Sequence, residues 1–129
     1  MPINSLIPYF DGADNVTATT TAVVVGKTLV AISANLASDN TVQVATCGAG
    51  AKAFGVAEYN AASGAWMGVV RKGIVPITCG AAALVAGVEV MSDANGNVVV
   101  WDGTVGHRQV GMCLTAANPG TDAMIAFYR

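Results

Sequence analysis

Residues 88–103 read VEVMSDANGNVVVWDG. Asp93, Asn95 and Asn97 stand at alternate positions, and oxygen ligands at alternate positions are how a helix-flanked calcium loop begins. Such a loop also needs glycine at its sixth position and glutamate at its twelfth. Counted from Asp93, those positions hold Val98 and Thr104. The stretch therefore lacks two required residues of a calcium loop, and we expect no metal ion here.

The same stretch has the pattern of a β-hairpin. Asn95-Gly96 is a pair that permits positive φ at both central positions of a tight turn. Strand-forming valines lie on either side of this pair: Val88, Val90, Val98 and Val100. We therefore expect two strands joined by a tight turn.

Short apolar runs of this kind recur along the whole chain, with turn residues about every eight to twelve positions. This pattern predicts an all-β fold, a small compact barrel or sandwich of short antiparallel strands and hairpins. Residues 79–87 form the one helix candidate, but they are few and bounded by glycines, so a single turn or a wide loop fits equally well. Residues 54–72 and 110–129 resemble each other, which indicates two similar hairpins, paired in one sheet or across a barrel, or chance convergence.

Residues 1–20 differ from the remainder, and we treat residues 21–129 as a single all-β domain. Pro2 and Pro8 disfavour helix and push their neighbours toward extended backbone. The segment is either an edge strand of the domain or an extended N-terminal arm that lies on another subunit. Its apolar residues are the candidate contacts of such an arm: Ile3, Leu6, Ile7, Tyr9 and Phe10.

The composition is unusually poor in charge. Of the 129 residues, 53% are hydrophobic and 11% charged, whereas soluble domains carry about 25% charged residues. Either neighbouring subunits cover much of the surface, or the surface is a neutral one of threonine, serine, asparagine and alanine. Six scattered Lys and Arg and a net charge of −2 argue against nucleic-acid binding.

The most apolar run, residues 73–88, is shorter than the ~20 residues of a membrane-spanning helix and contains Pro76. The N-terminus shows neither the basic start nor the long apolar segment of a signal peptide. We therefore expect no membrane association and a product made in the cytoplasm.

Few residues suit catalysis or metal binding. Cys47, Cys79 and Cys113 are far apart and odd in number, which favours buried free thiols over a disulfide framework. His107 is the only histidine and lies in a turn-like stretch, where we expect it to be exposed. No nucleophile elbow or phosphate-binding loop is present. We therefore expect no enzyme activity and no cofactor.

Two tryptophans and two arginines complete the candidate partner contacts. Trp66 and Trp101 are either plugs of the core or anchors of an interface, where tryptophan contributes much binding energy. Arg71 and Arg108 lie near strand ends, where they could pair with acidic groups of a partner or keep sheet edges soluble.

Between residues 54 and 100 the order of short motifs resembles that of the head decoration, or capsid cement, proteins of tailed bacteriophages. The resemblance extends over roughly residues 21–129, closing with a second hairpin. The matching residues are Gly55-Val56-Ala57, Gly73-Ile74-Val75-Pro76, Gly80-Ala81-Ala82-Ala83, Ala86-Gly87, Val88-Glu89-Val90, Asn95-Gly96 and Val110-Gly111. Cys79, Cys113 and the longer tail after Thr121 depart from the family pattern.

The resemblance implies a structural protein without catalysis that binds the outer surface of an icosahedral phage head. It implies homotrimers that bridge major capsid subunits and stabilise the shell against the pressure of the packaged genome. A different structural β-module, such as a fibre, baseplate or surface-adhesion subunit, is the alternative.

Overall fold

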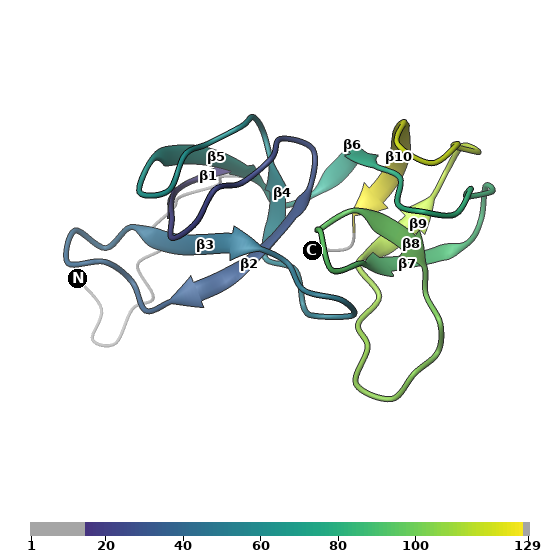
Figure 1. The fold of residues 1–129 in the computed structure, drawn as a ribbon, viewed down its shortest axis with the longest axis horizontal. Coiled ribbons are helices and arrows are strands. Elements are labelled where there is room, and N and C mark those ends of the chain that lie inside the picture. Colours follow the sequence, from purple (N-terminus) through teal and green to yellow (C-terminus); the bar gives the residue numbers. More distant parts are fainter. Residues whose placement is uncertain (1–14, 128–129) are drawn as a thin grey trace, which may run out of the picture.

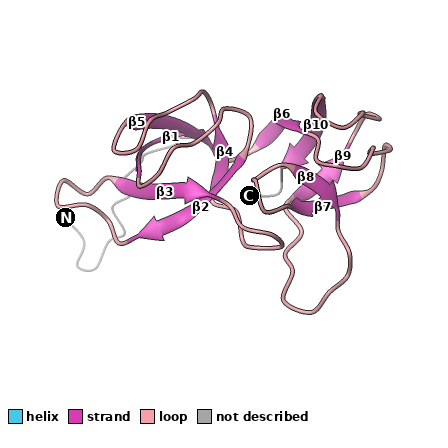
Figure 2. Ribbon diagram, in the orientation of Figure 1, coloured by secondary structure: helices cyan, strands magenta, loops and turns pink. Residues whose placement is uncertain are grey.

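A computed structural model describes residues 15–127 of the chain, drawn in Figure 1. These residues form ten β-strands and no helix (Figure 2), so the predicted all-β fold is confirmed. Residues 79–87, the helix candidate, lie mostly in a loop whose Leu84 forms a single β-bridge with Ala117. The strands are β1 (Asn15–Thr20), β2 (Leu29–Ala34), β3 (Val42–Thr46), β4 (Gly55–Ala57), β5 (Trp66–Val70), β6 (Gly73–Thr78), β7 (Glu89–Ser92), β8 (Val98–Val100), β9 (Gly111–Cys113) and β10 (Asp122–Phe127).

The first half of the chain is a closed barrel in the order β1-β3-β2-β4-β5. Antiparallel pairs build it except at one seam, where β1 and β3 run parallel. Side chains of Val16, Ala18 and Thr20 alternate inward along β1, with exposed or half-buried residues between them. Closure removes the sheet edges, which in an open sheet are templates for unwanted pairing.

The second half repeats this arrangement. Its sheet has the order β6-β10-β9-β7-β8. Read as a ring from β6 in the opposite direction, this is the order of the first barrel with each strand replaced by its counterpart five strands later. We call this half the second barrel, although a single bridge joins the two ends of its sheet. Where β1 and β3 close the first barrel, β6 and β8 approach each other through one parallel bridge, between Cys79 and Val98. The amide of Gly80 donates to the Val98 carbonyl at 2.8 Å at this seam.

Equivalent loops are tied by equivalent backbone hydrogen bonds. Val24 and Ala61 exchange two bonds of 2.9 Å in the first half, and Leu84 and Ala117 exchange bonds of 2.9 and 3.0 Å in the second. The two predicted hairpins are therefore real, as β4–β5 and β9–β10. They do not pair with each other, however, because they occupy the same place in two different sheets.

The two barrels share an apolar interface. One buried cluster lies inside the first barrel, and a second cluster combines the interior of the second barrel with residues on the outer side of the first. These outer residues are Leu29, Cys47, Ala53 and Val56. Backbone hydrogen bonds also cross the interface: Leu29 N donates to Gly96 O at 2.7 Å, and Arg108 N donates to Gly50 O at 2.9 Å. The barrels therefore pack as one unit.

The hairpin of residues 88–103 is confirmed as β7–β8, but its turn differs from the prediction. Ser92 pairs with Val98, so five residues form the loop. The Asp93 carboxylate accepts hydrogen bonds from the amides of Asn95 and Asn97, at 2.8 and 3.0 Å. Gly96 has φ +77°, whereas Asn95 is not among the residues with positive φ. The aspartate side chain stabilises a longer loop than the two-residue turn that Asn-Gly favours.

The N-terminal strand begins earlier than the division at residue 20 assumes. Asn15–Thr20 is β1, which pairs with β3 on one side and β5 on the other and is therefore part of the barrel. Its alternation is carried by threonine and alanine as well as valine, so it is weak in the sequence. The other residues of the predicted arm, residues 1–14, lie outside the described residues.

Candidate partner-binding surface

In the described chain the side chains that could bind a metal are scattered, and the thiols are buried. Within residues 15–127 no group of three or more His, Cys, Asp or Glu side chains could hold a metal ion. All three cysteines are free and buried, as predicted. Burial raises the pKa of Cys47 and Cys79, which keeps both thiols in the poorly nucleophilic protonated form. No helix in the described part of the chain is long and apolar enough to cross a membrane.

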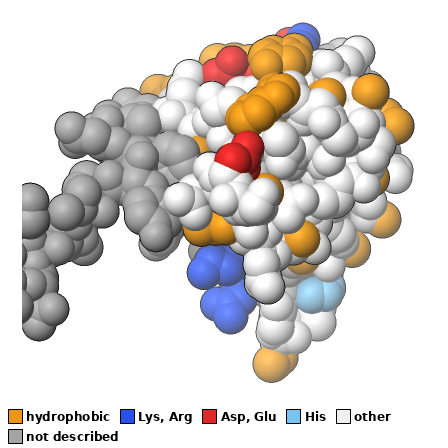
Figure 3. Space-filling model, turned by 90° about the vertical axis from the view of Figure 1, so that its left-hand side faces the viewer, with side chains coloured by type: hydrophobic (Ala, Val, Ile, Leu, Met, Phe, Trp, Pro, Cys, Tyr) orange, Lys and Arg blue, Asp and Glu red, His pale blue; other side chains and the backbone are white. Residues whose placement is uncertain are grey.

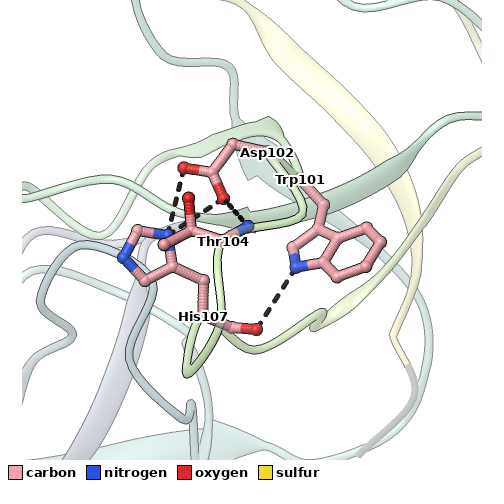
Figure 4. Close-up of polar contacts among 4 residues, drawn as sticks. All are labelled: Trp101, Asp102, Thr104 and His107. Atoms are coloured by element: carbon pink, nitrogen blue, oxygen red, sulfur yellow. Dashed lines mark hydrogen bonds and ion pairs between the residues drawn. The ribbon is translucent and has the colours of Figure 1, made fainter.

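The loop after β8 projects from the second barrel and is tied at its base (Figures 1 and 4). The Trp101 indole donates to the His107 carbonyl at 3.2 Å, and His107 Nδ1 lies 3.0 Å from both carboxylate oxygens of Asp102. The amide of Thr104 donates to Asp102 at 2.9 Å. This bond, with the His107 contact, lowers the pKa of Asp102. Val105, at the tip, is 99% exposed.

The prediction that His107 lies in a loop is confirmed, but its side chain is half-buried and not exposed as expected. Its side chain is only one-third exposed, at 33%. The ring lies so close to Gly50 that a Cβ there would overlap it. The contact could not be foreseen, because it joins the loop after β8 to the loop after β3 across the two barrels.

The candidate contact residues that fall within the described chain lie in separate places. Trp66 begins β5 and is 58% exposed, so it is not a plug of the core. Arg71 follows the same strand, where its guanidinium carbon lies 4.1 Å from the centre of the Phe54 ring. Trp101 is half-buried and Arg108 exposed, and both belong to the projecting loop of the second barrel. Whether these residues contact a partner remains a prediction, and the five N-terminal candidates lie outside the described residues.

The surface exposes more apolar side chains than the sequence analysis identified. The large ones are Val23, Val25, Ile32, Leu36, Tyr59, Trp66, Ile74, Val85, Val100, Val105, Leu114 and Met124. Figure 3 shows such side chains dispersed over a largely neutral face with few charges. Strand periodicity alone could not find them, because seven of the twelve lie outside the strands and the other five lie on strands with apolar residues on both faces.

One continuous part of this apolar surface is the outer face of the second sheet. Ile74 of β6 pairs with Ala126 of β10, and Pro76 pairs with Met124. Leu114 lies beside Met124, since its amide donates to the Met124 carbonyl at 2.9 Å. Ile74, Leu114 and Met124 are 62%, 40% and 37% exposed. This face offers a partner apolar area with little charge.

A charge-poor, tandem two-barrel β protein with exposed apolar faces is suited to binding other proteins. The family model described as phage cement protein matches residues 10–127. The chain therefore belongs to the phage cement protein family, and it is a structural protein of the phage head.

A solved structure shows a similar fold. The chain resembles the N-terminal base of the head fibre protein gp8.5 of bacteriophage phi29, with a TM-score of 0.72 and 16% sequence identity. The match covers 88% of this chain and 92% of that chain. At this identity the likeness concerns the fold alone. Comparison with curated proteins gave no match.

Proposed function

We propose that the protein is a non-enzymatic decoration protein on the outer surface of a phage head. It binds there as a homotrimer, bridges major capsid subunits and stabilises the shell against the pressure of the packaged genome. Membership of the phage cement protein family is the observation that carries the proposal.

The low proportion of charged residues supports a surface that partner subunits cover. Only 11% of residues are charged, and twelve large apolar side chains are exposed in the described chain. A monomer rarely exposes large continuous apolar areas unless a partner covers them. A standard protein contact covers roughly 800 Å² per partner. One contact within a trimer and another with the shell would together cover roughly 1,600 Å², which is nearly a quarter of the 7037 Å² surface.

The tandem barrels support bridging. Each barrel presents the same pair of bridged loops, at Val24–Ala61 and at Leu84–Ala117. Two loop pairs of similar backbone arrangement on one unit suit a partner that itself repeats, as neighbouring copies of a capsid subunit do. Linked contacts reinforce one another through a high effective concentration, so each one can be weak.

A binding experiment tests the proposal. Purified protein is mixed with heads that lack it, and bound protein is measured by co-sedimentation, together with the temperature at which the heads release DNA. We expect saturable binding and a higher release temperature, and analytical ultracentrifugation should show a trimer. No binding to the heads, or binding with an unchanged release temperature, would contradict the stabilising role.

The fold likeness to a head fibre base favours a second candidate, a base on which another head protein is mounted. In this second candidate function the chain would also bind the shell. The temperature of DNA release distinguishes the two functions, because a base for another protein need not raise this temperature.

A further inference from the structure

A groove lies where the two barrels meet, and residues of β4, β5 and β6 line it. Its volume is about 360 Å³. Val56, Val70, Val75 and Pro76 supply apolar lining, and Lys27 and Glu58 supply charge. Pockets for organic groups span roughly 300–1,000 Å³, so this one suits a small apolar group such as an aromatic side chain.

The described chain begins at the edge of this groove. Asn15, its first residue, pairs with Val70 of the groove lining. The Asn15 side-chain amide donates to the Glu58 carboxylate, another lining group, at 2.7 Å. The segment that precedes Asn15 therefore joins the described chain at the edge of the groove.

The segment carries residues that fit the groove. Tyr9 and Phe10 are adjacent aromatics, and Phe10 is five residues before Asn15. Five extended residues span at most roughly 17 Å, so Phe10 can reach the lining. Such a short tether also gives an effective concentration of about millimolar, at which a weak apolar contact is occupied.

Charge favours the same placement. Asp11 and Asp14 lie between Phe10 and Asn15, and Arg71 and Lys72 directly follow Val70. Because Asn15 pairs with Val70 in antiparallel register, Asp14 precedes one member of this pair in the sequence and Arg71 follows the other. Opposite charges attract each other, although ion pairs at a surface are weak.

We propose that Tyr9 and Phe10 occupy the groove between the barrels of their own chain. The aromatic pair anchors the N-terminal segment, and Ile3, Leu6 and Ile7 leave the molecule from a fixed point, available to a partner. This placement is independent of what the protein binds.

Cysteine cross-linking in the full chain tests the placement. The double variant Phe10→Cys with Pro76→Cys is oxidised, and Phe10→Cys with Val105→Cys is the control, because Val105 lies at the fully exposed loop tip. The three native cysteines are buried. We expect an intrachain disulfide between positions 10 and 76, several-fold more abundant than in the control. Cross-links between chains, or yields equal to the control, would overturn the proposal.

Hydrogen exchange supplies a second measurement that needs no new cysteine. The double variant Tyr9→Ser with Phe10→Ser should exchange several-fold faster over residues 70–78 than the wild type. Ile3→Ser with Leu6→Ser is the matched control and should leave this region unchanged. Equal protection in the wild type and the aromatic variant would also overturn the proposal.

Discussion

Replacing Leu29 with alanine tests whether the two barrels stabilise each other. Leu29 belongs to β2 of the first barrel, yet its fully buried side chain packs in the cluster of the second. The change removes three carbons, worth about 2.4 kcal/mol at ~0.8 kcal/mol per buried methylene group. Because the surrounding structure relaxes only in part, a cavity adds to this cost, and Leu→Ala changes in buried cores cost about 2–5 kcal/mol. We expect the free energy of unfolding to fall by about 3 kcal/mol.

Urea unfolding followed by circular dichroism measures this change. The control is Ile32→Ala on the same strand, whose side chain is 54% exposed. It should change the free energy of unfolding by less than about 1 kcal/mol. Hydrogen exchange should show faster opening in both barrels of the Leu29 variant. If Leu29→Ala lowers the free energy of unfolding no more than Ile32→Ala does, the interface between the barrels contributes little stability. Faster hydrogen exchange in the first barrel alone would lead to the same conclusion.

Further predictions concern the loops and metal binding. In thermal unfolding, Gly96→Ala should lower the free energy of unfolding by at least ~1 kcal/mol more than Gly120→Ala. Both glycines have positive φ, but of the two only Gly96 lies where a Cβ would meet a backbone oxygen, that of Leu29, at 2.7 Å. Equal losses would refute this clash. Because folding lowers the pKa of Asp102, the stability that this carboxylate gives to the loop is fully present above the ordinary pKa of 3.8. This stability is lost as the pH falls through the lower pKa of the folded protein. In a Trp66→Phe variant, acrylamide quenching of the remaining tryptophan, Trp101, should therefore rise on acidification. Adding Asp102→Asn should raise this quenching already at neutral pH. Quenching that does not change with pH in the Trp66→Phe variant would contradict this. Calcium should leave the melting temperature unchanged, and a rise of several degrees would restore the metal interpretation of Asp93.

Local sequence patterns predicted the strands better than their arrangement. Alternating valines located β7 and β8, and the turn between them was placed correctly. Its length was not, because the Asp93 carboxylate accepts two amides and so stabilises five loop residues. The alternation of β1 was missed since alanine and threonine fill two of its three inward positions, Ala18 and Thr20.

The duplication was recognised only in part because equivalent positions keep their backbone conformation and not their side chains. Asn40 and Gly96 both have positive φ, at 64° and 77°, in corresponding loops. Their amides make the same turn bond, to Ala37 and Asp93. A comparison of residue types finds no likeness between asparagine and glycine, although both tolerate this conformation.

The candidate contact surface was the least predictable part. Trp66 could be named as a large apolar residue, but its exposure follows from the barrel, where the neighbouring Met67 points inward and is fully buried. The face formed by Ile74, Leu114 and Met124 joins the β9–β10 hairpin to β6, which is distant from it in the sequence. Only the strand order β6-β10-β9 brings them together.

An electron-microscopy map of phage heads carrying this protein measures its position most directly. We expect paired small β-barrels on the outside of the shell, in groups of three chains, with each chain touching more than one major capsid subunit. A map in which the chain lies inside the shell, or stands alone with its apolar faces in solvent, would contradict it.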